Sequence, residues 1–455
     1  MSDVDVLILG GGSGGYSCAI RAEQLGLSVA LVEEDKLGGT CLHRGCIPTK
    51  ALLHTAEVAD SVRTSDQVGV GSTFGGVDAG AALDYQSTIV ASLYLGLQGL
   101  LKRPTIDIVH GTGHLTAPKT VSVGDRDITG KSVVLATGSY SRTVPGIELG
   151  PRVLTSDQAL TLQRVPESVV VLGGGVIGIE FASIWTSFGA QVTVVEALDR
   201  IIPGEDEWSS KQLGRALQKR GIELRVGTKV DTVQETDTGV IVTLSNGDIL
   251  ATDIVLVAVG RGPRTEGLGL AEHGIITDRG FVTVDDNLTT SATDVYAVGD
   301  IVAGYQLAHR GFQHGTFVAE HIAGRSPVRV DGDVIPRVTY SHPEVASVGL
   351  TEQVAKDKHS NVTSSVYDLG GNGKSRILGT AGGVKVIRAG DDGPIVGVHL
   401  VGDRVGELIG EAQLAVAWGA LPSEVGAFVH AHPTQNEALG EAMMALAGKP
   451  LHSHK

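Results

Sequence analysis

Cysteine is scarce in this chain of 455 residues, which contains only three. So few cysteines cannot hold together a chain of this length, and the sequence therefore excludes a disulfide scaffold. Basic residues are also in deficit, because 36 Lys and Arg against 51 Asp and Glu give a net charge of −15. This balance argues against nucleic acid or anionic lipid as a partner, since both need a basic surface.

Long hydrophobic runs are absent as well. No apolar run reaches the roughly 20 residues needed to cross a bilayer. The first residues include Asp3 and Asp5 and lead directly into a strand-like segment, without the basic and hydrophobic regions of a signal or transit peptide. We therefore expect a cytoplasmic protein without a membrane partner.

Glycine, in contrast, is abundant. The 63 glycines are about 14% of the chain, against a usual share of about 7%. Such an excess predicts many tight turns and close approaches of the backbone to ligands. The hydrophobic content of 42% is enough for buried cores, and the length predicts two to four domains.

One segment of the chain is repeated. Residues 4–33 read as an apolar strand, a glycine turn, a helix and a second strand, and residues 168–196 follow the same order. In each copy an acidic residue, Glu33 or Glu196, lies 23 positions after the first glycine. The long offset between the copies predicts two duplicated nucleotide-binding domains rather than a solenoid of short repeats.

Three glycines stand at matching positions in the two copies. They are Gly10, Gly12 and Gly15 in the first copy and Gly173, Gly175 and Gly178 in the second. The first glycine of each set permits a tight turn, the second lets the backbone approach a pyrophosphate, and the third allows close packing of helix on strand. The pyrophosphate then lies at the positive end of the helix.

The acidic residue of each copy is expected to accept a hydrogen bond from a ribose hydroxyl. A carboxylate at Glu196 would repel the 2′-phosphate of NADP, which favours NAD for the second site. Arg200 follows only four residues later and keeps NADP open as an alternative.

The rest of the chain shows weaker periodic patterns. They predict a helix over 89–101, short strands over 106–135, and a β-meander over 223–259 with a turn at Asn246-Gly247. From about Pro336 onward, strands at 383–387 and 395–401 and helices at 405–418 and 437–446 predict a separate α+β domain.

Residues 38–50 contain two of the three cysteines and read Gly-Gly-Thr-Cys-Leu-His-Arg-Gly-Cys-Ile-Pro-Thr-Lys. In a regular helix the Cα atoms of Cys41 and Cys46 would lie about 8–9 Å apart, whereas a disulfide tolerates about 7 Å. A bond between them requires a distorted helix, which Gly45 favours. The competing interpretation is a zinc site with His43, but the chain has no second cysteine cluster to complete it, so we expect no metal. Cys18 is expected to be a buried core residue.

The cysteine motif, the two glycine-rich turns and the strand that ends in Gly299-Asp300 resemble the pyridine nucleotide–disulfide oxidoreductases. The resemblance is strongest to members that oxidise dihydrolipoamide. It implies an α/β fold with two Rossmann-like dinucleotide-binding domains and a C-terminal α+β dimerisation domain. The implied boundaries are 1–145 for the FAD-binding domain, 146–267 for the NAD-binding domain, 268–334 for a central domain that completes the FAD site, and 335–455 for the dimerisation domain.

The resemblance also implies a role for each site residue. Cys41 exchanges with the substrate and Cys46 lies against the flavin, the two forming a redox disulfide. His432 is the base and Glu437 orients it, with the histidine supplied by the second subunit of a homodimer; Pro433 suits the first turn of the following helix. Lys50 and Glu180 form an ion pair near the reactive flavin nitrogen.

The cofactor-binding residues fall into two sets. Those implied for FAD are Gly10, Gly12, Gly15, Glu33, Thr40, Lys50, Thr137, Gly138, Asp300, Leu307, Ala308 and His309. Those implied for NAD are Gly173, Gly175, Gly178, Glu180, Glu196 and Gly260.

Some positions depart from the pattern common in this family. His43-Arg44 stands in the redox loop where relatives usually have Asn, and these residues either lower the pKa of the thiols or face solvent. Arg264 replaces an expected Asn, the segment 310–312 is less typical, and Gln435-Asn436 replaces the commoner Leu-Ser.

The expected reaction is oxidation of protein-bound dihydrolipoamide by NAD through the cysteine pair and FAD. The expected partners are lipoyl-bearing acyltransferase components of 2-oxo acid dehydrogenase complexes, or the glycine-cleavage lipoyl protein. The main alternative is an NADPH-dependent reductase of a small disulfide such as glutathione or mycothiol disulfide. A mercuric reductase would need a cysteine pair that residues 451–455 lack, and a non-catalytic flavin-binding scaffold would not need Cys41, Cys46, His432 and Glu437 together.

Overall fold

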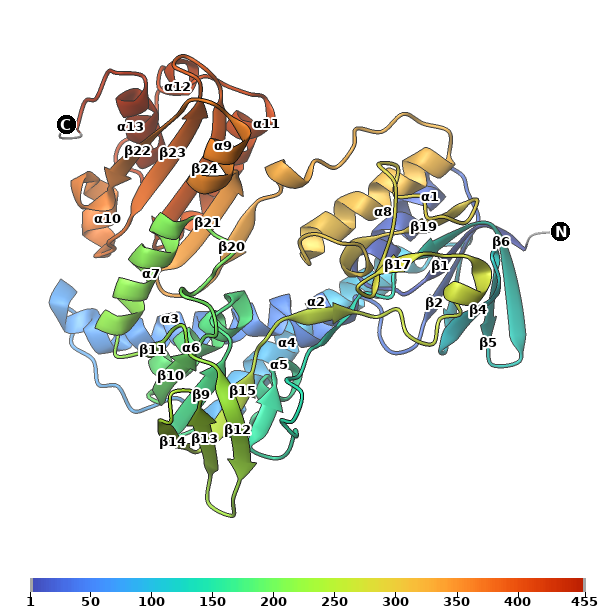
Figure 1. Cartoon of the computed structure of the whole chain (residues 1–455), viewed down its shortest axis with the longest axis horizontal. Helices are drawn as coiled ribbons and strands as arrows, with labels where there is room; N and C mark the ends of the chain where they lie inside the picture. The colour runs from blue at the N-terminus through green and yellow to red at the C-terminus, as the bar shows by residue number, and fades with distance from the viewer. Residues whose placement is uncertain (1–2, 453–455) are drawn as a thin grey trace.

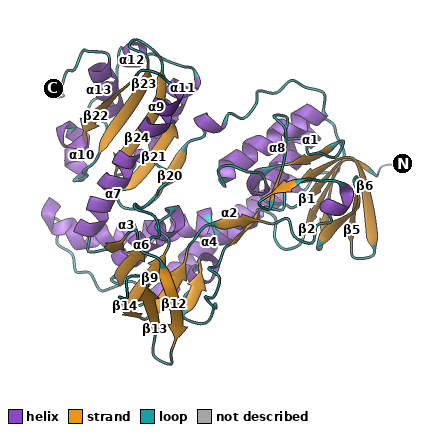
Figure 2. Cartoon of the chain, in the orientation of Figure 1, coloured by secondary structure: helices purple, strands orange, loops and turns teal. Residues whose placement is uncertain are grey.

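The computed structural model describes residues 3–452, so residues 453–455 of the C-terminal tail lie outside the described residues. Figure 1 shows three groups of strands, each covered by helices, with a long connection that leads from α8 to the C-terminal group. The distribution of helices and strands is shown in Figure 2.

The first sheet is mainly parallel. Its strands run in the order β3 (Ile106–His110), β2 (Val29–Glu33), β1 (Val4–Leu9), β6 (Arg126–Leu135) and β19 (Val295–Ala297). The long strand β6 also pairs antiparallel with β5 (Thr120–Val123), which pairs antiparallel with β4 (Gly113–Ala117). Val6, Leu7 and Ile8 are fully buried, as expected for a parallel strand that is covered on both faces.

Helices of this first part carry the redox motif. They are α1 (Ser13–Gln24), α2 (Gly39–Arg44), α3 (Cys46–Thr64), the 3₁₀ turn η1 (Ser65–Val68), α4 (Ala79–Leu101) and α8 (Ala308–Ile322), the last of which packs on α1. The helix predicted over 89–101 begins ten residues earlier than expected. Its first N-terminal turn is capped by Asp78, whose carboxylate accepts a hydrogen bond from the N–H of Ala81 at 3.1 Å.

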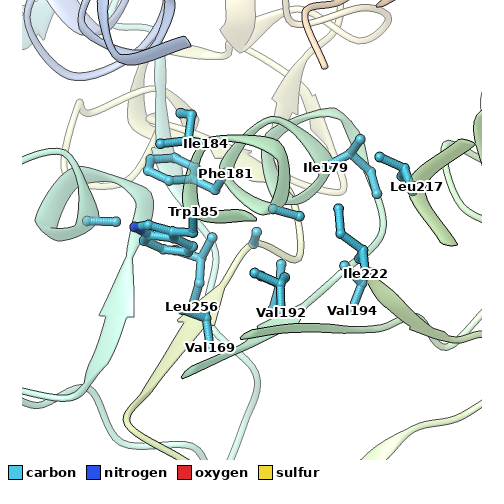
Figure 3. Packing of buried hydrophobic residues seen from close by; sticks show 14 of the residues in the cluster. Val169, Ile179, Phe181, Ile184, Trp185, Val192, Val194, Leu217, Ile222 and Leu256 are labelled. Atoms are coloured by element: carbon cyan, nitrogen blue, oxygen red, sulfur yellow. The ribbon is translucent and has the colours of Figure 1, made fainter. Parts of the chain in front are cut away.

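The second sheet has five parallel strands. Their order is β11 (Glu223–Arg225), β10 (Gln191–Val195), β9 (Ser168–Leu172), β15 (Ile254–Val257) and β8 (Val153–Thr155). The helices of this part are α5 (Ser156–Ala159), α6 (Val176–Phe188) and α7 (Glu207–Lys219). Phe181 and Trp185 of α6 pack over Val192 and Leu256 of the sheet, as Figure 3 shows. This core fixes the glycine loop that lies between β9 and α6.

The meander predicted over 223–259 is only partly correct. The strands β12 (Val230–Glu235), β13 (Val240–Leu244) and β14 (Ile249–Thr252) are antiparallel, and the turn at Asn246-Gly247 joins the last two. The segments at the two ends, β11 and β15, belong instead to the parallel sheet. The reason is that β15 is a continuous apolar run without alternation, which is typical of a strand buried on both faces.

Short elements connect the larger units. The strand β7 (Ser139–Ser141) pairs with β16 (Arg261–Pro263), and β17 (Thr277–Asp278) pairs with β18 (Phe281–Val282). The 3₁₀ turns are η2 (Ala271–His273), η3 (Gly299–Ile301) and η4 (Gly332–Val334).

The C-terminal sheet is antiparallel. Its order is β20 (Arg337–Thr339), β21 (Glu344–Gly349), β24 (Ile395–Gly402), β23 (Gly383–Ala389) and β22 (Val362–Asp368). The associated helical segments are α9 (Glu352–Lys358), η5 (Leu369–Gly371), α10 (Gly373–Leu378), η6 (Val405–Glu407), α11 (Ile409–Ala417), α12 (Pro422–Val425) and α13 (Glu437–Leu446). The helices α11 and α13 share one apolar core with the sheet, and α7 of the second part contacts β21 and β24.

The chain therefore has an α/β fold with two Rossmann-like dinucleotide-binding units and a C-terminal α+β unit. The predicted order of strand, glycine turn, helix and strand in residues 4–33 and 168–196 is confirmed, as are the strands and the last helix of the C-terminal third. The helix predicted over 405–418 is instead a 3₁₀ turn, η6, followed by α11. Within residues 3–452, no helix is both long enough and apolar enough to span a membrane.

Candidate active site

The two redox cysteines lie at the junction of two helices. α2 ends at Arg44 and α3 begins at Cys46, and Gly45 between them has φ −150° and ψ −110°, outside the helical region. A Cβ at Gly45 would lie 3.1 Å from the carbonyl oxygen of Thr40, so the junction is tightly packed. The predicted distortion of the helix between Cys41 and Cys46 is therefore confirmed.

The two thiols lie on either side of this helix break. Cys41 and Cys46 are both free thiols. Their interaction with each other and burial raise the pKa of Cys41. The same interaction and the positive charge of Lys50 lower the pKa of Cys46 despite its burial. The charge of Lys50 therefore favours a thiolate at Cys46, and the thiolate is the reactive form of a cysteine.

An ion pair stands one helical turn after Cys46. The ammonium of Lys50 donates to both carboxylate oxygens of Glu180, each at 2.9 Å. The backbone N–H of Tyr340 donates to the same carboxylate at 3.0 Å, and the Lys50 nitrogen lies 4.6 Å from the centre of the Tyr340 ring. Burial opposes the charge of Lys50, but Glu180 outweighs this effect, and the pKa of the ammonium is raised. The lysine thus stays charged beside Cys46.

The first glycine loop is shaped for a pyrophosphate. Gly10 has φ +106°, and a Cβ there would lie 2.4 Å from the carbonyl oxygen of Ala136. A Cβ at Gly15 would lie 1.8 Å from the carbonyl oxygen of Gly10. Around Gly12, the nearest atom to a Cβ would be 4.0 Å away, and no side chain caps the start of α1. The open N–H groups at this helix end fit a bound diphosphate.

The second loop repeats this geometry. Gly173 has φ +109°, and a Cβ there would lie 2.4 Å from the carbonyl oxygen of Ala258. A Cβ at Gly178 would lie 2.0 Å from the carbonyl oxygen of Gly173, whereas one at Gly175 would meet no atom within 4 Å. The roles predicted for the three glycines of each copy therefore agree with the packing around them.

The two acidic residues accept hydrogen bonds from the backbone of their glycine loops. Gly11 donates its N–H to Glu33 at 2.6 Å, and Gly174 donates to Glu196 at 2.7 Å. The second oxygen of each carboxylate accepts the N–H of the residue two positions later, at 2.9 and 2.8 Å. A carboxylate has about four acceptor positions, so each glutamate can also accept a ribose hydroxyl.

A cavity of about 780 Å³ adjoins the second loop. Its lining includes Gly173, Gly175, Glu196, Gly260, Leu307 and Arg337. Arg200 turns into its own loop, where its guanidinium donates to the carbonyl oxygens of Glu205 at 2.9 Å and Pro203 at 2.8 Å. The cation that would favour NADP is thus already engaged, and the cavity fits NAD.

Residues implied for the flavin site converge at the carboxyl edge of the first sheet. Thr137 and Gly138 follow β6, and Asp300 follows the adjacent parallel strand β19. Ser139 donates its hydroxyl to Asp300 at 2.6 Å, and Arg261 donates to that hydroxyl at 2.8 Å. Ligands bind at the carboxyl ends of strands in open α/β sheets, and this edge fits the polyol chain of FAD.

The helix α8 begins at the same edge. Leu307 and Ala308 form its first residues, and His309 contacts the carbonyl oxygen of Pro336 at 2.8 Å. The buried side chain of Arg310 donates to the carbonyl oxygens of residues 302, 303 and 305. The less typical segment at 310–312 therefore stabilises the loop that precedes the helix.

His43 and Arg44 have partners other than the sulfurs. The His43 ring contacts the carbonyl oxygen of Leu37 at 2.9 Å, and Arg44 pairs with Asp35 at 3.1 Å. Arg44 faces solvent, which is the second of the two expectations, whereas His43 is half-buried with its ring 4.9 Å from that of Tyr94. Cys18 is fully buried in α1, and burial raises its pKa to about 12, as expected for a core residue.

The base and its acid form a second, separate cluster. Nδ1 of His432 lies 2.9 Å from Glu437, at the start of α13, and the N–H of Thr434 donates to the other carboxylate oxygen at 2.9 Å. The His432 side chain is 78% exposed. Figure 1 shows α13, the helix that follows this cluster, far from α2 within the chain.

Sequence reasoning missed Tyr340, Ser139 and Arg261. Ser139 directly follows Thr137-Gly138, and this position could have indicated that it belongs to the same site. Tyr340 reaches Glu180 across 160 residues of sequence, so no local pattern could indicate it. Across the described part of the chain, no group of three or more His, Cys, Asp or Glu side chains is placed to hold a metal ion.

Two loops for dinucleotides and a thiol pair beside a buried ion pair define a protein that exchanges electrons between a nucleotide cofactor and a disulfide. The family described as pyridine nucleotide-disulphide oxidoreductase matches residues 4–315, and its dimerisation domain matches residues 335–443. The chain belongs to this family.

Among its relatives is a dihydrolipoyl dehydrogenase of Bacillus subtilis, 42% identical over 99% of both chains. Another is the mitochondrial dihydrolipoyl dehydrogenase 1 of Arabidopsis thaliana, 39% identical over 98% of this chain and 91% of that protein. A similar crystal structure is that of LpdA from Mycobacterium tuberculosis, with a TM-score of 0.90 and 25% identity over 97% of this chain and 99% of the other.

Proposed function

We propose that this chain oxidises protein-bound dihydrolipoamide, with FAD as its bound cofactor and NAD as the hydride acceptor. The observation that carries the proposal is the thiol pair on either side of the helix break at Gly45, with the Lys50–Glu180 ion pair one helical turn after Cys46. The relatives named dihydrolipoyl dehydrogenase support the substrate class.

The chain's own residues hold the two nucleotides. The first loop, Glu33 and the edge around Asp300 hold FAD, and the second loop with Glu196 and its cavity holds NAD. We assign Thr40, Lys50 and the start of α8 to FAD, and Glu180 and Gly260 to NAD, with the Lys50–Glu180 ion pair joining the two sets. When bound, FAD supplies the two-electron chemistry that links the cysteine pair to NAD.

The dithiol reaction begins with a proton transfer. Nε2 of His432 accepts a proton from one substrate thiol, because Nδ1 is bound to Glu437. The substrate thiolate attacks Cys41 in the Cys41–Cys46 disulfide, a mixed disulfide forms, and Cys46 leaves as a thiolate. The second substrate thiol then attacks the substrate sulfur of the mixed disulfide. Lipoamide is released with a closed disulfide, and Cys41 leaves as a thiol.

The active site is completed by a homodimer in this proposal. The C-terminal unit matches a dimerisation domain, and it exposes Trp418 at the end of α11 as well as Phe428 and Val429 in the loop of His432. We divide the chain into an FAD-binding domain at 1–145, an NAD-binding domain at 146–267, a central domain at 268–334 and a dimerisation domain at 335–455. Electrons then enter through Cys41 of one subunit, and His432 of the partner subunit accepts the proton of the substrate thiol.

The partners follow from the substrate. We propose that lipoyl-bearing acyltransferase components of 2-oxo acid dehydrogenase complexes, or the glycine-cleavage lipoyl protein, deliver the dithiol, and that the enzyme works in the cytoplasm. The net charge of −15 and the absence of a spanning helix in residues 3–452 are compatible with this environment.

A steady-state assay of the purified protein tests the proposal. Free dihydrolipoamide with NAD is compared with glutathione disulfide with NADPH and with mycothiol disulfide with NADPH. We expect rapid NADH formation in the first mixture and little NADPH oxidation in the others. Preferred use of NADPH with a small disulfide would replace the proposed function by that of a low-molecular-weight disulfide reductase.

A further inference from the structure

The loop that carries the base is exposed, so contacts with the rest of the chain must hold it in position. It runs from the end of α12 to the start of α13, and Val429 at its beginning is 99% exposed. A general base has to reach its proton within about 2.6–3.2 Å, and a displacement of 1 Å can reduce the rate by roughly 100-fold. The structure must therefore fix this loop in place.

One carboxylate binds both ends of the loop. Glu411 on α11 contacts Nε2 of His430 through Oε1 at 2.9 Å. Its other oxygen accepts a hydrogen bond from the side-chain amide of Asn436. His430 and Asn436 flank His432 on its two sides, so Glu411 bridges the loop that carries the base.

His430 is also seated on the helix of the orienting acid. Its side chain is only 11% exposed, and its ring lies against Gly440 of α13. A Cβ at Gly440 would come within 2.6 Å of Nδ1 of His430. Because α13 begins at Glu437, this packing fixes the start of the loop relative to the acid that orients the base.

Asn436 is one of the residues that depart from the pattern common in the family. Its amide nitrogen lies one bond further from the backbone than a serine hydroxyl would, and it reaches Glu411 on the neighbouring helix. Gln435 adds a second tie by donating to the carbonyl oxygen of Asp403 at 2.8 Å. The hydrogen bonds of Gln435 and Asn436 thus hold the loop against the rest of the C-terminal unit.

We infer that Glu411 is a positioning residue for the base His432, acting through His430 and Asn436. The inference rests on the proposed function, in which His432 takes the proton of the substrate thiol. Glu411 itself touches neither substrate nor cofactor. It holds the two ends of the loop at one point, so that His432 and Glu437 keep a common orientation toward the partner subunit.

The test compares Glu411→Gln with the wild-type dimer in two reactions. A Gln side chain presents only one acceptor oxygen to the two donors, so one end of the loop is released. We expect turnover with dihydrolipoamide and NAD to fall by roughly 10–100-fold, with an altered pH profile of kcat/KM. NADH-dependent reduction of a dye, flavin content and KM for NADH should stay unchanged, because none of these needs the base.

Glu441→Gln is the matched control. Glu441 is a buried carboxylate on α13 that binds Nδ1 of His452 at 2.7 Å, outside the loop of the base. This variant should keep the wild-type turnover and pH profile. Asn436→Ala, which releases one end of the loop without touching a charge, should show the same selective loss as Glu411→Gln, and it replaces that variant if the latter fails to fold.

The outcomes separate the inference from the proposed function. Unchanged dithiol turnover and pH profile in Glu411→Gln and Asn436→Ala would overturn the inference, as would an equal loss of dye reduction, which would indicate a general structural role. If the wild-type protein does not oxidise dihydrolipoamide, the proposed function itself fails and the inference fails with it.

Discussion

At the scale of single residues, charge placement decides which sulfur reacts. Lys50 stays protonated because Glu180 binds it with both oxygens, and it lies one turn from Cys46. The interaction between the two thiols and burial raise the pKa of Cys41, whereas the same interaction and Lys50 lower the pKa of Cys46, so a thiolate is favoured at Cys46. This division matches the two tasks proposed for the cysteines, exchange with substrate at Cys41 and charge donation at Cys46.

Replacement of His432 by Gln should separate two activities. Loss of the base removes a contribution of about 10²–10⁴-fold to dithiol oxidation, whereas electron transfer from NADH to dyes does not need it. Turnover with dihydrolipoamide and the dye-reduction rate are measured on the same preparation. Equal loss of both activities would show that His432 is not the base.

Glu344 should make stability depend on pH. Burial raises its pKa from 4.5 to about 7, and the charges of Asp403, Glu407 and Glu57 act in the same direction, although Gly406 donates an N–H to the carboxylate. The folded state therefore holds this proton between pH 4.5 and 7 while the unfolded state has lost it, so stability falls as the pH rises through this window.

Glu344→Gln should remove this penalty. We expect the variant to be more stable than the wild type at pH 8, by about 1–3 kcal/mol on the scale of 1.36 kcal/mol per pKa unit, and no more stable at pH 4. Gln can still accept the N–H of Gly406, so the comparison isolates the charge. Thermal unfolding at the two pH values measures the effect, and an equal shift of Tm at both would contradict the assigned pKa.

At the scale of elements, the sequence identified the features that depend on local geometry. The βαβ units follow from glycines whose missing Cβ atoms leave room for a neighbouring carbonyl, and the helix break at Gly45 follows from the spacing of the cysteines. The predictions that were wrong concern features that depend on tertiary contacts. β15 joins a parallel sheet through partners 85 residues away, and the meander pattern around it contains no information about them.

Gly175→Ala should weaken NAD binding without unfolding the chain. A Cβ at this position meets no protein atom within 4 Å and φ is −75°, so alanine is tolerated, but it occupies the space for the pyrophosphate. We expect the KM for NAD to rise roughly 10-fold or more, equivalent to about 1.4 kcal/mol, with flavin content unchanged. Gly214→Ala in α7, where a Cβ would make only an ordinary contact at 3.7 Å, is the control. An unchanged KM in Gly175→Ala would contradict the placement of NAD.

At the scale of the whole molecule, ion pairs connect the three units. The half-buried Lys50 and the buried Glu180 link the first two, while two buried pairs, Arg337 with Glu205 at 3.0 Å and Lys385 with Asp206 at 2.7 Å, link the second to the third. Removal of one partner of a buried pair costs about 3–5 kcal/mol. These ion pairs thus connect the three units within each chain, and in the proposed function the base of one chain serves the cysteines of the second.

Hybrid dimers should reveal this sharing of the site. Cys41→Ser and His432→Gln homodimers are each expected to be inactive with dihydrolipoamide. A hybrid with one subunit of each kind has one site with both defects and one with neither, so the hybrid purified after co-expression should show about half of the wild-type turnover per dimer. Hybrids that stay inactive would show that the base and the cysteines act within one chain.

The central claim is that the Cys41–Cys46 pair passes electrons from a dithiol to a bound flavin, with Cys46 as the thiolate beside it. It is tested most directly by the visible absorption of the purified protein during anaerobic titration with dihydrolipoamide. We predict a yellow protein that takes up one equivalent and gains a long-wavelength thiolate–flavin band, which Cys46→Ser abolishes and which Cys41→Ser shows before any substrate is added. A colourless protein, or the same band in Cys46→Ser, would contradict the account.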